Sequence, residues 1–362
     1  MIENLSLREK IGQMLIVGLD SNVINERIKN LILNYKISGV ILYRKNFNTY
    51  EDMVKLISEL KQLNSKNKIP LFIAVDQEGG RVNRMPPEFH NLLSAYKLAN
   101  TKNLDLVRTA GDVTGEMLSK SGFNMNFAPV LDILRKDTTE SIGNRCFGEN
   151  AEDVSKYGIE TMKQLQKHKI VSVIKHFPGQ GKARADAHFL LPTVKKIENQ
   201  DTLPFQNAIK NGADIIMLGH LLVKDTSKIY PASLSKKMIR KLRLKYHFKG
   251  VIITDDLKMK AIKYIYGTKW AFKKAFYVGN DMVLFRFNKK EEIESIESVI
   301  KLVERGKIKQ RRIDKSVKRV IELKKKYGLD DNSKIEKCNI EEINKKIDDI
   351  NEFVNNYKKE IL

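Results

Sequence analysis

Eight short apolar runs recur along the chain: GQMLIVGL, SGVILYR, IPLFIAVD, FNMNFAPVLDI, IVSVIKHF, ADIIMLGHLLV, GVIITDDL and DMVLFRF. Between them lie longer segments whose apolar residues have helical spacing, such as YEDMVKLISELKQLN and AEDVSKYGIETMKQLQKH. Uninterrupted apolar runs that alternate with helices predict strands buried on both faces of a parallel sheet. Eight such units predict a single (β/α)8 TIM-type barrel over residues 1–328. A doubly wound open sheet is the alternative, but no G-x-G-x-x-G follows an early run.

The pattern changes after Gly328. In residues 329–362 the apolar positions are separated by three or four residues, and they are Ile340, Ile343, Ile347, Ile350, Val354, Tyr357 and Ile361. This spacing predicts a C-terminal amphipathic helical extension with a narrow apolar seam. The seam either lies across the barrel surface or pairs with another copy as a coiled coil.

Polar residues gather directly after the apolar runs. They are Asp76, Gln77, Glu78 and Arg84 after the third run, Asp132 after the fourth, Lys175 and His176 in the fifth, His220 in the sixth, and Asp255 and Asp256 in the seventh. Catalysis in a (β/α)8 barrel takes place at the carboxyl ends of the strands, so we expect a site there. Asp255 in that place could be a nucleophile, a base or a metal ligand. Because strand side chains alternate in direction, we expect Asp256 to point elsewhere.

The loop that follows the fifth run, KHFPGQGKARADAHF, contains two of the six histidines. Asp186 and His188 can place a carboxylate against an imidazole, which orients the ring and suits it to transferring protons. A nucleophilic Asp255 together with this pair would make a two-step displacement possible. A single histidine in such a loop could equally have a structural role.

The formal net charge of +22 raises the question of an anionic partner. Lys is spread over the whole chain, and the densest run, residues 301–326, has twelve basic and three acidic residues. Its apolar residues have helical spacing, so we interpret it as a solvated helix face, with attraction to an anionic polymer or membrane surface as the alternative. No basic motif interleaved with aromatic residues supports nucleic-acid binding.

Other features of the sequence set expectations about its surroundings. No apolar stretch approaches the ~20 residues of a membrane span, and the first residues lack signal-peptide features. Cys146 and Cys338 are far apart and form no disulfide framework. We therefore expect a cytoplasmic monomer with no membrane span, no nucleic-acid partner, no metal site and no organic cofactor.

Six motifs occur in a fixed order: AVDQEGGRVNRM (74–85), FAPVLDI (127–133), SIGNRCFG (141–148), KHFPGQG followed by DAH (175–181 and 186–188), YPASLS (230–235) and GVIITDDLKMKAI (250–262). This ordered set resembles glycoside hydrolase family 3, and within it the NagZ-type β-N-acetylglucosaminidases. The resemblance covers about residues 5–328.

The resemblance also implies roles for individual residues. Asp255 would be the nucleophile that forms a covalent glycosyl-enzyme, and His188 the general acid/base with Asp186 as its partner. The residues that hold the hydroxyls of a terminal GlcNAc would be Asp76, Arg84, Arg145, Lys175 and His176. The implied reaction is exo-acting, retaining release of GlcNAc from a cell-wall fragment (a muropeptide) or a chito-oligosaccharide. Phosphorolysis, a β-glucosidase activity and a silent GlcNAc-binding barrel remain open alternatives.

The loop departs from the family pattern at four positions: Gln180 replaces His, Lys182 replaces Asp, Ala183 replaces Thr and Ala187 replaces Ser. A cation at Lys182, near Asp186 and His188, would disfavour the imidazolium and lower the pKa of His188. If Lys182 is instead solvated and screened, the change has no effect.

Overall fold

The eight apolar runs form the eight strands of one parallel sheet. The computed structural model describes residues 2–135, 142–183, 191–286 and 289–361. The barrel strands are β1 (Leu15–Gly18), β2 (Gly39–Ile41), β3 (Phe72–Val75), β4 (Met125–Asn126), β5 (Val171–Phe177), β7 (Ile215–Leu218), β9 (Val251–Thr254) and β10 (Val283–Phe285). Their order is β10-β1-β2-β3-β4-β5-β7-β9, and every neighbouring pair is parallel. A parallel bridge between Ile253 and Met282 joins the two ends of this order, which confirms the predicted TIM-type barrel.

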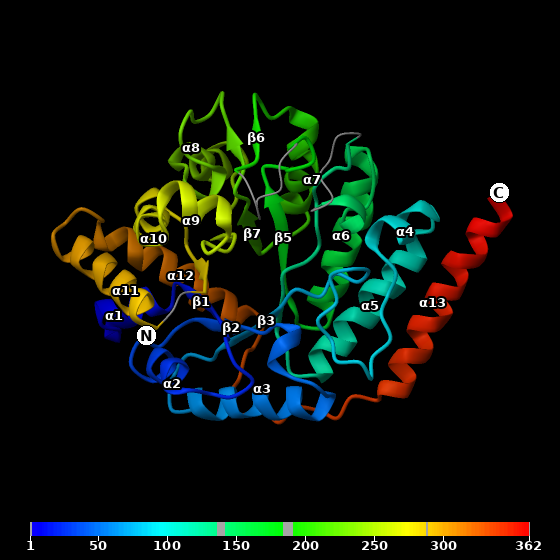
Figure 1. Cartoon of the computed structure of the whole chain (residues 1–362), viewed down its shortest axis with the longest axis horizontal. Helices are drawn as coiled ribbons and strands as arrows, with labels where there is room; N and C mark the ends of the chain where they lie inside the picture. The colour runs from blue at the N-terminus through cyan, green and yellow to red at the C-terminus, as the bar shows by residue number, and fades with distance from the viewer. Residues whose placement is uncertain (1, 136–141, 184–190, 287–288, 362) are drawn as a thin grey trace.

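Helices alternate with the strands and surround them (Figure 1). They are α1 (Leu7–Gly12), α2 (Glu26–Leu33), α3 (Tyr50–Asn64), α4 (Ala95–Asn100), α5 (Leu104–Lys120), α6 (Ala151–Lys167), α7 (Asn199–Lys210), α8 (Lys236–Arg240), α9 (Lys260–Tyr266), α10 (Thr268–Val278), α11 (Lys289–Glu304), α12 (Gln310–Lys326) and α13 (Ile340–Ile361). A small parallel pair, β6 (Thr193–Val194) and β8 (Leu222–Val223), lies beside the barrel.

Both faces of the barrel strands are buried, which explains why the runs are apolar without interruption. Alternate residues such as Ile16, Val173 and Ile253 belong to the apolar cluster inside the barrel. Their neighbours, such as Val17 and Ile252, belong to the larger cluster between the strands and the helices. A strand with two buried faces cannot show polar alternation, so the sequence pattern follows directly from the layers.

The basic run of residues 301–326 ends in α12, whose apolar stripe packs against the barrel. Ile313, Val317, Val320 and Ile321 are buried, while most of the Lys and Arg lie on the outer face. This confirms the interpretation of the run as an amphipathic helix. No helix in the described part of the chain is long and apolar enough to cross a membrane.

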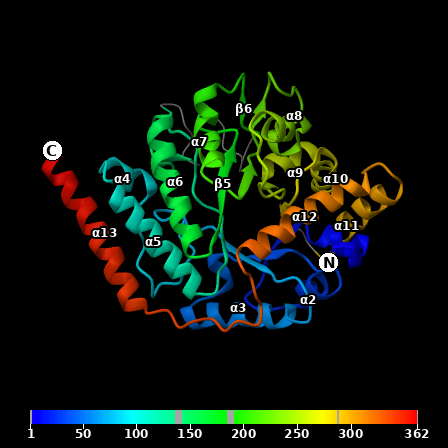
Figure 2. The ribbon, with the colours of Figure 1, turned by 180° about the vertical axis from the view of Figure 1, so that it is seen from behind.

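Helix α13 packs along α5 at the edge of the molecule, as the views from front and back both show (Figures 1 and 2). Its seam residues Ile343, Ile347, Ile350 and Val354 are at most 3% exposed. The seam therefore lies across the barrel surface within the same chain, which was the first of the two expected arrangements. Because these four side chains are covered within the same chain, they are not available to form the seam of a coiled coil.

Candidate active site

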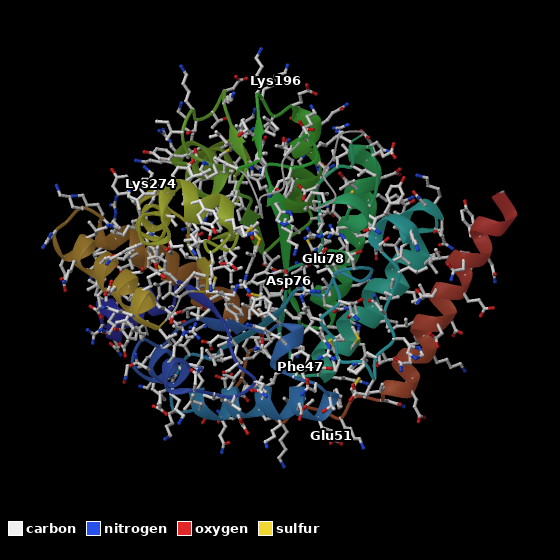
Figure 3. The ribbon with its side chains drawn as sticks, viewed as in Figure 1. Phe47, Glu51, Asp76, Glu78, Lys196 and Lys274 are labelled. Carbon is white, nitrogen blue, oxygen red and sulfur yellow. The ribbon has the colours of Figure 1, made fainter. Side chains whose placement is uncertain are left out.

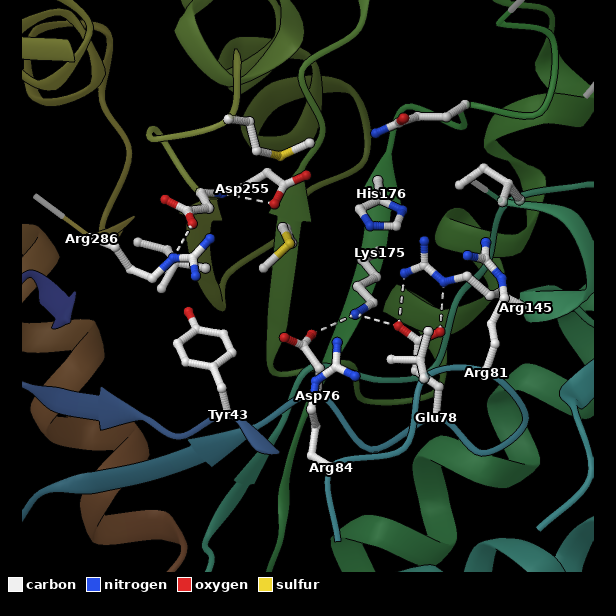
Figure 4. A pocket seen from close by; sticks show the side chains of 17 residues that line it. Tyr43, Asp76, Glu78, Arg81, Arg84, Arg145, Lys175, His176, Asp255 and Arg286 are labelled. Atoms are coloured by element: carbon white, nitrogen blue, oxygen red, sulfur yellow. Dashed lines mark hydrogen bonds and ion pairs between the residues drawn. The ribbon is translucent and has the colours of Figure 1, made fainter. Parts of the chain in front are cut away.

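A pocket of about 430 Å³ opens at the carboxyl ends of the barrel strands (Figure 4). It is lined by Tyr43, Asp76, Glu78, Arg81, Val82, Arg84, Ile142, Arg145, Lys175, His176, Gln180, Met217, Asp255, Asp256, Met259, Leu284 and Arg286. All six predicted site residues outside the 184–190 segment are in this list. Asp186 and His188 lie outside the described residues, so their placement and roles stay predictions. Figure 3 shows Asp76 and Glu78 near the middle of the molecule, while Lys196 and Lys274 lie at its edge.

The centre of the pocket is a network of two cations and two carboxylates. Lys175 Nζ lies 2.8 Å from Asp76 Oδ1 and 2.6 Å from Glu78 Oε1. Arg145 donates through Nε and Nη2 to the two oxygens of Glu78 at 2.7 and 2.8 Å, a forked geometry that fixes both planes. The side chains of Lys175 and Glu78 are 3% and 4% exposed. Their charges are therefore held in place by each other and not by water.

The network keeps its members charged. Burial alone would raise the pKa of Glu78, but the adjacent Arg145 and Lys175 hold it far below its usual range. Burial would lower the pKa of Lys175, but Asp76 and Glu78 outweigh it and raise that pKa. The pocket thus presents fixed ammonium, guanidinium and carboxylate groups at neutral pH. Such groups suit a ligand with many hydroxyls, which both donate and accept hydrogen bonds.

Lys175 and His176 are consecutive in β5 and yet both line the pocket. The pairing of β5 with β7 shifts register between Ile174 and Phe177, so the regular alternation of side chains is interrupted there. Asp132 orients the imidazole: its Oδ2 lies 2.7 Å from His176 Nδ1, and its Oδ1 accepts from the Gln180 amide at 2.7 Å. A single buried carboxylate therefore fixes both the ring and the start of the following loop.

The same loop can leave β5 only because of a glycine at position 181. A Cβ atom there would lie 1.8 Å from the Ile133 carbonyl oxygen, which is far inside contact distance. Gly179, with φ of +108°, has a backbone conformation that L side chains rarely adopt. The two glycines of the FPGQG motif therefore serve the path of the chain toward the predicted Asp186 and His188.

Asp255 follows the last residue of β9 and is half-buried in the pocket wall. Its Oδ1 accepts a 2.7 Å hydrogen bond from the Asp256 amide. Burial would raise the pKa of Asp255, but His220, His176, this amide and Lys175 together lower it. The carboxylate is ionised at neutral pH and faces the cavity, as a nucleophile must.

The expectation that Asp256 points elsewhere is wrong, because it lines the same pocket. Strand β9 ends at Thr254, so the alternation of side chains no longer applies to the next two residues. Asp256 Oδ2 pairs with Arg286 Nε at 2.7 Å, and Oδ1 accepts from the Lys258 amide at 2.9 Å. The Arg286 guanidinium in turn lies 4.7 Å from the centre of the Tyr43 ring. Asp256 is thus committed to holding Arg286, which leaves Asp255 as the available carboxylate.

His220 is fully buried and packs against the backbone at Asp255 and Asp256. Its Nε2 lies 2.9 Å from the Asp256 carbonyl oxygen, and its Nδ1 lies 2.8 Å from Ser233 Oγ. Nε2 donates to the carbonyl, and Nδ1 forms the second hydrogen bond with the hydroxyl. Both ring nitrogens are used, so His220 positions the Asp255–Asp256 backbone.

The segment that carries Arg84 is held by amide side chains. Gln77 Oε1 accepts from the Arg84 amide at 2.8 Å, and Asn126 at the end of β4 exchanges two 2.9 Å hydrogen bonds with the Gln77 backbone. Gly80 donates to the Leu92 carbonyl at 2.7 Å, so the turn at 79–82 rests on residues 91–94.

Two asparagines of α13 hold the backbone on which that turn rests. Asn344 accepts from the His90 amide and donates to the Glu88 carbonyl, both at 2.8 Å. One further heptad along the helix, Asn351 makes the same pair of bonds with Leu93 and Asn91, both at 3.0 Å. We name residues 88–93 the clamped segment. Through it, the C-terminal helix supports the wall of the pocket.

Lys182, the departure from the family pattern, is paired with two carboxylates. Its Nζ lies 2.9 Å from Glu198 Oε2 and 3.2 Å from Asp201 Oδ2. These partners neutralise its charge locally. We therefore expect little effect of Lys182 on the pKa of His188, for a different reason from the solvent screening that the sequence suggested.

The sequence profile described as "Glycosyl hydrolase family 3 N terminal domain" matches residues 6–323. The chain belongs to glycoside hydrolase family 3. The match leaves α13 outside, as the motif resemblance did. Within residues 2–135, 142–183, 191–286 and 289–361, no group of three His, Cys, Asp or Glu could hold a metal ion.

Individual relatives of this family 3 chain carry more specific names. It is 31% identical over 328 residues to "Beta-hexosaminidase A" of Pseudoalteromonas piscicida, a match that covers 83% of this chain and 55% of that one. It is 33% identical over 273 residues to a "Beta-hexosaminidase" of Neisseria meningitidis serogroup B, covering 72% and 74%. The chain thus spans about half the length of the first relative and three quarters of the second.

Among solved structures, the chain is similar to a glycoside hydrolase family 3 β-N-acetylglucosaminidase from Paenibacillus sp. str. FPU-7. The TM-score is 0.89 at 30% identity, over 96% of this chain and 68% of that one. Because 96% of this chain is aligned, the superposition takes in nearly all of its elements.

Sequence reasoning placed the predicted binding residues of this family 3 chain on one rim but missed some of their partners. Glu78 and Asp132 were noted as rim residues without a role, although Glu78 joins Lys175 to Arg145 and Asp132 orients His176. Arg286, directly after β10, was not considered. Its position in DMVLFRF was the available signal, because Arg286 directly follows the eighth apolar run just as Asp76 and Asp255 follow theirs.

Proposed function

We propose that this family 3 protein is an exo-acting, retaining β-N-acetylglucosaminidase that releases terminal GlcNAc from cell-wall fragments or chito-oligosaccharides. The observation that carries the proposal is the ionised Asp255 carboxylate facing a small pocket beside the Asp76–Lys175–Glu78–Arg145 network. The names of the relatives support GlcNAc as the sugar. The pocket volume lies in the range of small-molecule sites, about 300–1,000 Å³.

The charge balance of the pocket favours a neutral polar ligand over a polyanion. Four carboxylates and five cations line it, and Asp76, Glu78 and Asp256 are already paired with cations. The remaining groups can donate to and accept from sugar hydroxyls. A nucleic-acid phosphate would meet Asp76 and Asp255 at close range.

The proposed reaction has two steps. In the first, Asp255 attacks the anomeric carbon, and the bond to the glycosidic oxygen breaks while that oxygen receives a proton. In the second, water attacks the same carbon and displaces Asp255, giving up its proton. His188, with Asp186 as its partner, is the group to which the family resemblance assigns both proton transfers. Lys175 and Arg145 would hold the sugar hydroxyls against fixed charges while the ring flattens toward the oxocarbenium-like transition state.

Two measurements test the proposal. The nitrophenyl β-glycosides of GlcNAc and glucose should be hydrolysed with a strong preference for the GlcNAc compound. Incubation with a 5-fluoro GlcNAc trap should add one glycosyl mass, and peptide mass spectrometry should place it on Asp255. A preference for glucose would mean a β-glucosidase, and binding of GlcNAc without turnover would mean a silent barrel. An adduct on another residue would remove Asp255 as nucleophile. The cytoplasmic location and the monomeric state stay predictions from the sequence.

A further inference from the structure

A second cavity, of about 760 Å³, lies at the opposite end of the barrel from the candidate active site. Lys249 lines it just before β9, and Asp281 lines it just before β10. The active-site residues Asp255 and Arg286 follow the same two strands. The cavity therefore belongs to the amino-terminal face of the barrel, and its residues take no part in the proposed hydrolysis. Residues 309–312, at the start of α12, form its other wall.

The lining is strongly basic, and its one carboxylate is saturated. Asp281 Oδ1 accepts from Ser316 Oγ at 2.7 Å and from Arg319 Nη1 at 3.0 Å. Its Oδ2 accepts from the Ile252 amide at 2.9 Å and from Arg243. Asp281 therefore compensates at most one of the two arginines that bind it.

Four further cations on the lining have no carboxylate partner in the part of the chain that the structure describes. They are Lys249, Lys309, Arg311 and Lys315. Exposed lysines and arginines usually avoid such crowding because like charges repel. A concave site with one sign of charge concentrates ions of the other sign.

Arg312 also lines the cavity, and part of its guanidinium group lacks a hydrogen-bond partner. Its Nη2 donates to the Asn280 carbonyl, while its Nε and Nη1 are buried without a hydrogen-bond partner. Burial lowers the pKa of Arg312 to about 10; Asp281 opposes this shift, and Arg319 and Arg243 add to it. A buried guanidinium with two unpaired nitrogens is costly, and a nearby anion would reduce that cost.

The beginning of α12 adds backbone donors to the same place. The helix is 17 residues long, Lys309 caps it without a side-chain hydrogen bond, and its first turn has no acidic residue. Among the described residues, no backbone carbonyl outside α12 accepts from the amides of Gln310 and Arg311. Helix amino termini favour anions, yet here the first turn has Arg311 and Arg312. The cations and the helix end therefore favour the same kind of ligand.

We propose that this cavity is a binding site for a phosphorylated small molecule, with the phosphate at the start of α12. Lys309, Arg311 and Lys315 would bind the phosphate oxygens, and the apolar side chains of Ile239 and Phe248 would contact the organic part. The volume exceeds what a phosphate ion needs, which is why a phosphate ester fits better than free phosphate. The inference is independent of the proposed hydrolysis.

The test measures ligand binding by calorimetric titration at constant ionic strength. It compares the wild type with two variants, each of which has two substitutions. The probes are glucose 6-phosphate, inorganic phosphate and glucose. Arg311→Gln combined with Lys315→Gln removes two exposed cations of the lining. The control is Lys318→Gln combined with Lys325→Gln, which removes two α12 cations outside the cavity, with Lys318 likewise exposed. Thermal unfolding of each variant should stay close to that of the wild type, because the substituted cations lie on the solvent side of α12.

We expect saturable binding of glucose 6-phosphate to the wild type and the control, weakened at least tenfold by Arg311→Gln/Lys315→Gln, and no binding of glucose. Weaker binding of inorganic phosphate at the same site supports the proposal, because the phosphate group is then the part recognised. Equal binding by both double variants would overturn it, since the anion would then sit elsewhere, the catalytic pocket included. Absence of saturable binding at millimolar concentrations overturns it as well. So does a preference for a duplex oligonucleotide over the sugar phosphate, which would make this face a polymer-binding surface.

Discussion

Glu78→Gln is the sharpest single test of the network that joins Lys175 to Arg145. The substitution keeps the size of the side chain and one acceptor oxygen, but it removes the charge shared by two buried cations. Three contacts of 2.6–2.8 Å are affected. Breaking a buried ion pair by removing one partner typically costs about 3–5 kcal/mol. We therefore expect the free energy of unfolding to fall by about that amount at pH 7.

The same change should weaken catalysis, because Lys175 and Arg145 would no longer be fixed against the substrate. A misplacement of about 1 Å can cost as much as 10²-fold in rate, so we expect kcat/KM on nitrophenyl-GlcNAc to fall by about 10- to 100-fold. Urea unfolding followed by circular dichroism gives the first quantity, and initial rates give the second. Glu59→Gln, at an exposed position of α3, is the matched control and should change neither.

The pH dependence gives a further check on the cause. The folded-state pKa of Glu78 is well below its unfolded value of about 4.3, so its stabilisation is fully present above that value. It is lost as the pH falls from about 4 toward the folded pKa. The difference between wild type and Glu78→Gln should be constant from pH 5 to 8 and shrink below pH 4. A loss under about 1 kcal/mol at pH 7, or a difference that grows on acidification, would refute the reasoning.

Three further predictions follow from single residues. Asp255→Ala should lower kcat by at least ~10³-fold with an unchanged circular dichroism spectrum, and substantial residual turnover would rule it out as nucleophile. His188→Ala should slow substrates with poor leaving groups by ~10²–10⁴-fold and activated aryl glycosides much less, whereas equal losses would contradict an acid role. Burial lowers the pKa of Lys324 to about 7. Keeping the buried ammonium charged therefore destabilises the fold, fully so below pH 7 and less and less as the pH rises toward the unfolded pKa of about 10.4. In urea unfolding, the free energy of unfolding of the wild type should therefore rise by about 2 kcal/mol relative to that of Lys324→Met between pH 7 and 9. If the unfolding free energies of the two proteins instead change in parallel over that range, Lys324 does not titrate there.

The sequence was sufficient to predict the barrel because each strand is buried on both faces and therefore apolar throughout. It also placed the predicted binding residues on one rim, because the ends of parallel strands meet at one face. Pairings across that rim could not be read from the chain. Glu78 follows β3 and pairs with Lys175 of β5, with β4 between the two strands in the sheet. The two residues are far apart in sequence, so no local pattern predicts their pairing. The direction of the Asp256 side chain was predicted wrongly because β9 ends at Thr254, two residues before it, so strand alternation does not apply there. The 184–190 segment, which contains Asp186 and His188, lies outside the described residues and adds nothing to this comparison.

The clamped segment ties the wall of the pocket to a helix far along the chain. The hydrogen bonds from Asn344 and Asn351 span 254 to 260 residues of sequence. Closure of the barrel spans an equally long stretch of sequence, since Leu15 of β1 pairs with Val283 of β10. Sequence separation therefore sets no order between closure of the barrel and docking of α13. The consequence concerns the folded protein: the pocket wall depends on the docking of α13, although α13 supplies no residue to the pocket lining. A change that loosens α13 from α5 is therefore expected to weaken sugar binding while the barrel strands keep their pairing.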